Sequence, residues 1–551
     1  MALAVLYALP DLRVAFSGPY VVQNDARQHV FWARRFEDAA LFPHDLIADY
    51  FQAVAPSGYT LLYRAAAAVG LDPVLFGKLL PVALALVAVG CTFAFAARVL
   101  PHPAAAFAAS ALLSQHLWLT DELASGTPHA FAIPLLAAFL YLLSRRAALG
   151  CALALALQGL FYPQILLVSC GTLVLWLLRL EGGRPRLARE RRDWILAAAG
   201  LAAAAASLLP FALASSRFGP TVTEGVARGM PEFFRGGRAR FFDRDPWTFW
   251  IVAHRSGLLG KFFSASGPFI WAGVPMLGGM LLPILTALPR AFPLAGRVTR
   301  DAGLLARLGL ASLLLFAAAH ALVFRLHLPS RYAMFSIRIV LAVAAGAVLV
   351  IVADVVGRRL RRGGRAFSVL RRGLAALGIV AVSGFLALPL VQEPGGAYIV
   401  GDEPALYRFF ERQPPDALVA SVSPEADNIP IFSRRSVLVS RLHAVPYQLG
   451  YYRRIHSRVT DLLRAEYAED PAELRAFVRA YGVDFILLDR WSFRPRYLLL
   501  DSWVRQYRPL VEELAGRMER GSKPALETLA EGCKALETER MIVVDATCLL
   551  R

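Results

Sequence analysis

Carboxylate side chains occur early in the chain, in the polar segment 17–73 that follows a short apolar run. Asp25 stands in the stretch NDARQH, close behind that run. A carboxylate can accept the proton of an attacking hydroxyl group when it lies within hydrogen-bond distance. The alternative is that Asp25 only caps the helix that the following residues predict. Asp25 is therefore a candidate general base.

A second pair of carboxylates, Asp121 and Glu122, lies in the polar turn WLTDELASGTPH between two apolar runs. If those runs cross a membrane, this turn lies on the same side as Asp25. One of the two carboxylates could then orient the base or the acceptor, or supply oxygen ligands to a divalent cation. The alternative is a polar turn that caps the next helix, which Pro128 begins. No CxxC or HExxH motif points to a bound transition metal, so the metal requirement stays open.

A cationic segment, FRLHLPSRYAMFSIR, precedes one of the last apolar runs. Arg331 and Tyr332 stand there at the predicted start of a helix, where the helix dipole and the guanidinium fork could bind a phosphate group. The alternative is that such arginines only reach toward anionic lipid headgroups. The candidate substrate-binding residues are Arg331, Tyr332, Arg325, His327, His29 and Lys261.

The composition excludes an ordinary soluble protein. Of the 551 residues, 57% are hydrophobic and 18% are charged, and the mean hydropathy is +0.50, whereas soluble domains have about 45–50% apolar and about 25% charged residues. Several apolar runs approach or exceed the roughly 20 residues that a helix needs to cross a bilayer. The predicted fold class is a polytopic α-helical membrane protein with about 11 transmembrane helices. The predicted spans are residues 1–16, 74–97, 104–119, 128–143, 147–160, 163–178, 194–214, 267–288, 304–324, 333–356 and 374–391.

The charge distribution predicts the orientation of these spans. The tail, residues 392–551, holds 22 basic and 23 acidic residues, so the whole of the net charge of +18 lies before it. Arginine clusters in the short segments around 145–146, 179–192, 290–307 and 358–372 indicate cytoplasmic loops. The N-terminus is then cytoplasmic and the tail is extracytoplasmic, and no nucleic-acid partner is needed to explain the charge. The many arginine and alanine residues favour a GC-rich bacterial genome, and the expected location is the bacterial inner membrane.

Three large pieces then face outward: the loops 17–73 and 215–266, and the tail. Apolar and charged residues alternate from Gln28 to Phe36. This pattern predicts a helix that lies in the membrane interface with its aromatic side chains toward lipid. The first run carries Asp11 and Arg13, which predicts either a helix buried in the bundle or a start that lacks residues.

The sequence of the tail predicts an α/β domain. Its strands are expected at 418–422, 436–440, 484–488 and 541–545, and its helices at 447–467 and 471–481. Cys533 and Cys548 could pair if the tail faces an oxidising compartment.

An Asp soon after the first span, a long first outer loop, many short-looped spans and an outer C-terminal domain resemble the GT-C superfamily of integral membrane glycosyltransferases. The resemblance implies a GT-C-like transmembrane domain over residues 1–391 and an outer domain over 392–551. The tail segments YGVDFILLDRW and SPEADNIPIFSRRSVLVS are similar to the outer domains of a bacterial subfamily. The motif NDARQH differs from the Asp-Glu and Asp-x-Asp forms better known in the superfamily.

The resemblance also implies an activity. The donor would be a sugar on a polyprenyl-phosphate carrier, and the acceptor a lipid, a glycan or a protein. Asp25 occupies the position of the acidic residue that acts at the acceptor, and Arg331 with Tyr332 that of the part holding the lipid phosphate. Direct transfer would invert the anomeric carbon. Two alternatives stay open, namely a transporter or flippase for a lipid-linked sugar and a catalytically silent membrane scaffold.

Overall fold

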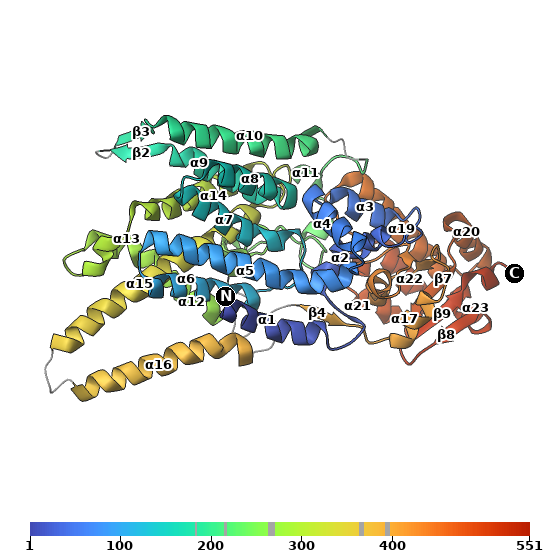
Figure 1. Ribbon diagram of the computed structural model, residues 1–551. Helices are drawn as coiled ribbons and strands as arrows, with labels where there is room; N and C mark the ends of the chain where they lie inside the picture. The colour runs from blue at the N-terminus through green and yellow to red at the C-terminus, as the bar shows by residue number, and fades with distance from the viewer. Residues whose placement is uncertain (182–183, 214–216, 263–269, 363–367, 392–396) are drawn as a thin grey trace.

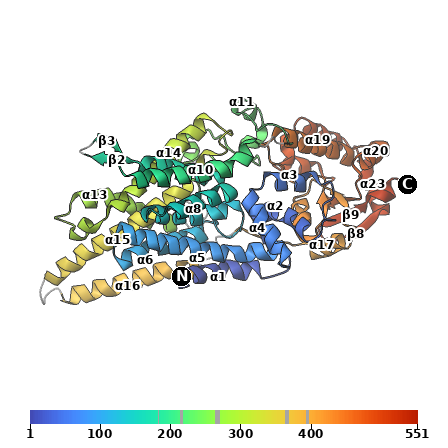
Figure 2. The same ribbon diagram turned by 45° about the horizontal axis from the view of Figure 1, so that its top comes forward.

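The computed structural model describes residues 1–181, 184–213, 217–262, 270–362, 368–391 and 397–551. Apolar helices form a bundle at one end of the molecule, and the tail forms a mixed helix and strand domain at the other (Figure 1). The short helices of the first outer loop lie between the two in both views (Figures 1 and 2).

A helix occurs at each predicted span. The span at 267–288 is broken into α12, η7 and α13, and its first residues lie outside the described part of the chain. Five helices in the described part are long and apolar enough by themselves to cross a bilayer, namely those within 73–99, 191–210, 300–321, 329–361 and 372–391. The number of crossings therefore stays a prediction. The bundle helices are α1 (Ala2–Ala15), α5 (Pro73–Val99), α6 (Pro103–Leu119), α7 (Ala132–Ser144), α8 (Ala148–Phe161), α9 (Pro163–Trp176), α10 (Arg191–Leu213), α12 (Ile270–Leu277), η7 (Gly278–Leu281), α13 (Leu282–Ala287), α14 (Gly303–Ala321), α15 (Met334–Arg362) and α16 (Ser368–Val391).

Helices α8 and α9 form the hairpin that the sequence predicts, with its turn at Tyr162 and Pro163. Each has 14 residues and is about 21 Å long at 1.5 Å per residue. Helix α1 buries one face, which includes Asp11 at 3% exposure. Tyr7 on the same face donates a hydrogen bond of 2.9 Å to the carbonyl of Leu386 in α16.

The predicted cytoplasmic segments gather at the end of the bundle opposite the tail, where β2 (Leu178–Glu181), β3 (Arg184–Leu187), α13 and the adjoining ends of α15 and α16 lie (Figure 1). Ion pairs connect two of the arginine clusters. Arg146 lies 2.6 Å from Glu190 and 3.6 Å from Asp193, and Asp193 also lies 2.6 Å from Arg179. The arginine-rich loops thus share one face of the molecule, as the charge pattern predicts.

The first outer loop folds into β1 (Val21–Gln23), α2 (Asn24–His29), η1 (Phe31–Phe36), α3 (Leu46–Val54) and α4 (Ser57–Ala68). The predicted interfacial helix is wrong. Phe31 and Trp32 are fully buried, and the ring of Phe31 lies 5.1 Å from that of His443 in the tail. Trp32 packs against Phe36 and Tyr59 of the same loop. Protein therefore covers both aromatic side chains, and an alternating pattern does not distinguish a lipid-facing surface from one covered by protein.

The second outer loop contains short elements: α11 (Glu224–Ala227), η3 (Pro231–Phe233), the π-helix η4 (Thr248–Val252) and η5 (Gly260–Phe262). Phe233 and Phe241 pack with Phe324, which follows α14, at ring distances of 4.8 and 5.1 Å. Tyr447 of the tail lies against the same cluster. This aromatic cluster joins the loop, the end of the bundle and the tail.

The tail contains a five-stranded sheet in the order β6-β5-β7-β9-β8. β5 is parallel to both β6 and β7, whereas β9 is antiparallel to β7 and β8. The four predicted strands and the two predicted helices are confirmed, and the short, partly exposed β8 was not predicted. The tail elements are α17 (Pro404–Glu411), β5 (Leu418–Ala420), η12 (Pro424–Asp427), α18 (Ile429–Phe432), β6 (Ser436–Val437), α19 (Leu449–Glu466), α20 (Pro471–Tyr481), β7 (Phe485–Asp489), α21 (Pro495–Leu500), η13 (Val504–Tyr507), α22 (Leu510–Glu519), α23 (Ala525–Gly532), β8 (Lys534–Glu537), β9 (Met541–Asp545) and α24 (Ala546–Leu549).

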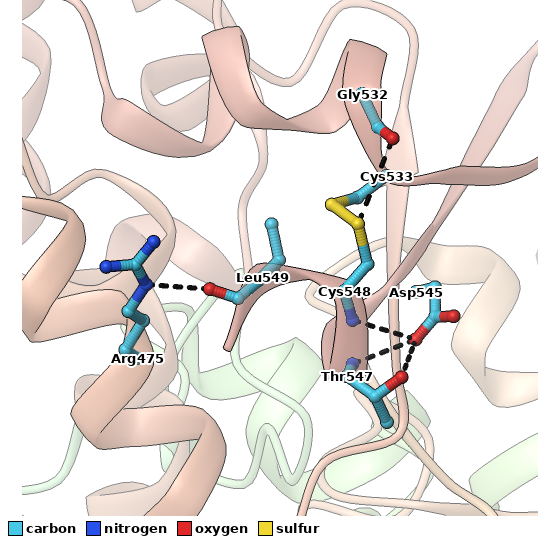
Figure 3. Close-up of a disulfide and its surroundings, with 7 residues drawn as sticks. All are labelled: Arg475, Gly532, Cys533, Asp545, Thr547, Cys548 and Leu549. Atoms are coloured by element: carbon cyan, nitrogen blue, oxygen red, sulfur yellow. Dashed lines mark hydrogen bonds between the residues drawn. A yellow bond between two sulfur atoms is a disulfide. The ribbon is translucent and has the colours of Figure 1, made fainter. Parts of the chain in front are cut away.

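Two connections stabilise the tail. Its first strand, β4 (Tyr398–Val400), pairs antiparallel with β1 of the first outer loop. Cys533 and Cys548 form a disulfide with a Cα–Cα distance of 5.6 Å (Figure 3). Asp545 caps α24 beside it, and Arg475 of α20 donates a hydrogen bond of 2.7 Å to the carbonyl of Leu549. The C-terminal end of the chain is thereby held against α20 and α23.

Candidate active site

The strand β1 and the turn after α6 meet at one side chain, Gln23. Its amide nitrogen lies 2.9 and 3.2 Å from the two carboxylate oxygens of Asp121 and donates to them. Its amide oxygen accepts hydrogen bonds from the backbone N–H groups of Asp25, at 2.6 Å, and Ala26, at 3.0 Å. Gln23 therefore holds the start of α2, where Asp25 is half-buried, against the carboxylate of Asp121.

The turn that carries Asp121 has an unusual backbone. Asp121 has φ +54°, in the left-handed region, which Asp tolerates better than most residues. Gly126 has φ +61°, and a Cβ atom there would lie 2.6 Å from the carbonyl oxygen of Gly77 in α5, so glycine permits this close approach. Ser125 and Thr127 share a hydrogen bond of 2.8 Å, and Thr127 contacts His129 Nδ1 at 2.9 Å. The turn is thus seated on α5.

Glu122 points elsewhere. Its carboxylate lies 3.0 Å from a guanidinium nitrogen of Arg338 in α15, and both side chains are at most 3% exposed. His116 of α6 lies within electrostatic range of both. The predicted pair of outer carboxylates is therefore divided: Asp121 faces Gln23, and Glu122 forms an ion pair inside the bundle.

Two cations, Arg27 and Arg238, and the imidazole of His29 lie within electrostatic range of the Asp25 carboxylate. Arg238 comes from the second outer loop and contacts Gln28 at 3.3 Å. Together these cations create a positive potential at the start of α2, which favours the binding of an anionic group nearby.

A row of three arginines continues from Arg238 to Arg331, with His327 beside two of them, and we call Arg238, Arg255 and Arg331 the cationic row. Arg255 donates a hydrogen bond of 3.2 Å to the carbonyl of Arg238 and one of 3.1 Å to the hydroxyl of Tyr447. The backbone N–H of Ser330 donates to the carbonyl of Arg255 at 3.3 Å. These bonds bring two outer loops and the tail together around the row.

Two histidines near these cations are held neutral. Desolvation by the surrounding protein lowers the pKa of His29 to about 4, although the Asp25 carboxylate opposes this shift. Desolvation, together with the charges of Arg331 and Arg255, lowers the pKa of His327 to about 3. A neutral imidazole can donate one hydrogen bond and accept another near pH 7.

The remaining predicted binding residues fall in different places. Tyr332 is 2% exposed and donates a hydrogen bond of 2.8 Å to the carbonyl of Leu326, so it orders the turn before α15. Arg331 is half-buried, contacts the sulfur of Met334 at 3.2 Å and lies near Tyr162. Arg325 is exposed. The side chain of Lys261 lies outside the described part of the structure.

No pattern in the sequence marks Gln23, and Arg238 and Arg255 stand among several arginines of the loop 215–266 that suit a lipid diphosphate or anionic headgroups equally well. A glutamine beside Asn24-Asp25 carries no pattern that marks it as the partner of a residue 98 positions away. In that loop the arginines alternate with aromatic residues, and periodicity does not say which of the arginines turn toward the first outer loop. Within the described ranges, no group of three or more His, Cys, Asp or Glu side chains could hold a metal ion.

No protein-family model and no curated protein sequence matches the chain. The fold does match solved structures. The apo oligosaccharyltransferase of Archaeoglobus fulgidus superposes with a TM-score of 0.53 at 14% identity, over 93% of this chain and 72% of that one. Archaeal AglB from the same organism, in complex with an inhibitory peptide and a dolichol-phosphate, gives a TM-score of 0.54 at 13% identity, with the same coverage.

ArnT from Cupriavidus metallidurans in the apo state superposes with a TM-score of 0.50 at 14% identity, over 99% of this chain and 98% of that one. These proteins are GT-C glycosyltransferases. The chain therefore has the fold of these membrane glycosyltransferases, which is the fold that the resemblance to the GT-C superfamily implies.

Proposed function

We propose that the chain is an inverting glycosyltransferase that moves a sugar from a polyprenyl-phosphate carrier to an extracytoplasmic acceptor. The observation that carries this proposal is the placement of Asp25 at one end of the cationic row, on a GT-C fold. The archaeal AglB with this fold was solved with a dolichol-phosphate, which supports a lipid-linked donor for this chain as well.

In the proposed reaction, Asp25 accepts the proton of the acceptor hydroxyl group while the oxygen of that group attacks the anomeric carbon of the donor. The bond between this carbon and the phosphate oxygen breaks, and the polyprenyl phosphate leaves with the electron pair. The new bond forms on the opposite face, so the configuration inverts. No covalent intermediate between the sugar and the enzyme is required.

The other residues have supporting roles in this proposal. Arg331 and Arg255 stabilise the negative charge that develops on the leaving phosphate. Asp121, held by Gln23, serves as the auxiliary acidic group, whereas the buried ion pair of Glu122 with Arg338 fits a structural role. His29, one helical turn after Asp25, would hydrogen-bond to the acceptor as a neutral imidazole.

We infer further that the tail and the outer loops face the extracytoplasmic side of a bacterial inner membrane. Two observations support this orientation. The arginine-rich loops lie at the opposite end of the bundle, and such loops are retained in the cytoplasm. The tail carries the disulfide between Cys533 and Cys548, and disulfides persist in oxidising compartments.

The test is transfer of labelled sugar from a panel of polyprenyl-phosphate sugars by the purified full chain in lipid, with wild type compared to Asp25→Asn. Loss of a general base slows transfer by about 10²–10⁴-fold, so we expect transfer to fall by that factor while donor binding is retained. Asp38→Asn is the matched control because Asp38 is exposed in the same loop. Donor binding without any transfer by wild type would favour a transporter, and no donor binding a scaffold.

A further inference from the structure

A cavity of about 570 Å³ lies in the tail, apart from the cationic row. Its volume is in the range of small-molecule binding sites, which are typically about 300–1,000 Å³. Its wall includes Ser423 and Glu425, which follow β5, and Asp489 and Trp491, at and after the end of β7. Helix α21 supplies part of another wall through Tyr497. The two parallel strands therefore end at this cavity.

The strand order places the cavity at a characteristic point of an open sheet. From β5 the chain continues to β6 on one side, and from β7 it continues to β8 and β9 on the other side. β5 and β7 are adjacent and parallel, so their onward connections diverge. In open α/β sheets, ligands bind in the crevice outside the carboxyl ends of two such strands. Asp489, paired in register with Met541 of β9, stands at that edge.

The polar groups of the cavity are held in place by their neighbours. The hydroxyl of Tyr497 donates a hydrogen bond of 2.6 Å to Asp489, and the side chain of Ser423 also hydrogen-bonds to that carboxylate. Glu425 accepts hydrogen bonds from Asn428, at 2.8 Å, and from Tyr407. Both carboxylates therefore present fixed acceptor oxygens.

The charged side chains of the cavity wall indicate which class of ligand fits it. The wall has four carboxylates and three guanidinium groups, so it has no excess of positive charge that would favour a phosphorylated ligand. Within the described residues no group of acidic side chains could hold a metal ion. A ligand rich in hydroxyl groups fits this wall, because each hydroxyl can donate to a carboxylate and accept from a guanidinium.

An aromatic side chain completes the match. Trp491 is 39% exposed at the cavity and offers a flat apolar surface. A sugar ring has one face of C–H groups that can pack on such a surface, while its hydroxyl groups reach the polar wall. Arg494 and Arg496, both exposed, stand beside it at the start of α21.

A chain of hydrogen bonds connects this cavity with the helix that carries Asp25. Asn428, which donates to Glu425, accepts a hydrogen bond of 2.6 Å from Arg27 of α2. Arg27 in turn donates at 2.6 Å to Asn24, the neighbour of Asp25. A molecule in the cavity would therefore contact a wall that is connected to α2 by hydrogen bonds.

We propose that this cavity binds a neutral oligosaccharide, the glycan acceptor of the transfer reaction. The assignment of the ligand as acceptor rests on the proposed function, whereas the binding of a neutral oligosaccharide does not. The glycan could be free or attached to a lipid, because only its sugar rings would enter the cavity.

The experiment is titration of the purified full chain in nanodiscs with neutral trisaccharides of gluco, galacto, manno and arabino configuration, followed by saturation-transfer NMR and calorimetry. We expect at least one trisaccharide to bind wild type, with affinity reduced about tenfold or more in Trp491→Ala and in Asp489→Asn. Trp491 is exposed, so Trp491→Ala tests the site even if the Asp489 variant fails to fold. Arg490→Ala is the matched control, since Arg490 pairs with Glu537 outside the cavity.

Two results would overturn the inference: no neutral trisaccharide binds, or one binds equally well to the Trp491 and Asp489 variants. Binding of a cationic glucosamine trisaccharide or an anionic galacturonate trisaccharide in place of the neutral ones would also contradict it. Asp25→Asn separates the two proposals, because it should lose transfer and keep trisaccharide binding. If wild type binds a trisaccharide but transfers no sugar, the proposed function fails and the binding site stands.

Discussion

The side-chain amide of Gln23 donates to both carboxylate oxygens of Asp121 and accepts from the backbone N–H of Asp25. One side chain thus connects the carboxylate of Asp121 with the backbone of Asp25, which stands 96 positions earlier in the sequence. Because Asp121 is 9% exposed, it depends on this amide for part of its hydrogen bonding. The position of Asp25 relative to Asp121 is therefore set by Gln23.

Replacement of this amide should impair turnover more than binding. In Gln23→Leu the start of α2 loses its anchor, and we expect kcat to fall by about ten- to a hundredfold while KM for the donor changes little, because a small displacement of a reacting group is costly. Steady-state kinetics of sugar transfer would measure this. Gln52→Leu, in the same outer loop, is the control, and an unchanged kcat in Gln23→Leu would contradict the positioning role.

The buried pair of Glu122 and Arg338 should respond as a structural ion pair. Arg338→Met leaves the Glu122 carboxylate buried without its cation, which costs about 3–5 kcal/mol of stability. The double variant Glu122→Gln with Arg338→Met removes both charges and should regain most of that loss. Thermal unfolding in detergent and sugar transfer should be measured on Glu122→Gln, on Arg338→Met and on the double variant. A stable but inactive Glu122→Gln variant would contradict the structural role of Glu122.

The cationic row can be tested with two arginines of the same segment. Arg331→Ala removes a charge-assisted hydrogen bond to the phosphate, and we expect KM for the polyprenyl-phosphate sugar to rise by about ten- to a hundredfold. Arg331→Lys should recover only part of this affinity, because lysine lacks the planar fork. Arg325→Ala should stay close to wild type, since Arg325 is exposed on the neighbouring turn. Equal effects of the two alanine variants would indicate general attraction to anionic lipid.

The stability of the tail should depend on pH through Glu466. This side chain is 1% exposed, and its desolvation, with the nearby Asp489, raises its pKa to about 8. Because the folded protein binds this proton more tightly than the unfolded chain, the stabilisation is complete below the unfolded pKa near 4.5 and is lost as the pH rises toward 8.

Glu466→Gln removes this dependence. Between about pH 5 and pH 8, the variant should gain stability over wild type on the order of 1 kcal/mol per pH unit. Melting temperatures of both proteins across this range would measure the gain. Glu469→Gln, three residues later and exposed, should follow wild type at every pH. Parallel melting curves for wild type and Glu466→Gln would show that the carboxyl group is not shifted in this way.

Much of the fold could be predicted because its signals are local. The helices at the predicted spans and the tail strands follow from runs of apolar residues, and Pro471 marks the start of α20. The arginine clusters predicted which ends of the helices lie together, since like loops gather on one side of a membrane. The prediction that Phe31 and Trp32 face lipid was wrong. A run of apolar residues predicts that the side chains are buried, but it does not tell whether lipid or protein covers them.

The sequence by itself determined the membrane class, the succession of helices and strands, and the three segments that carry Asp25, Asp121 and Arg331. Only the tertiary structure decided the partners of these residues. In the folded chain Asp121 accepts hydrogen bonds from Gln23, and Glu122 pairs with Arg338. Arg238 and Arg255 lie in one row with Arg331. The physical reason is that side-chain contacts between distant segments depend on how the helices and the tail pack, and no periodicity within a segment encodes them.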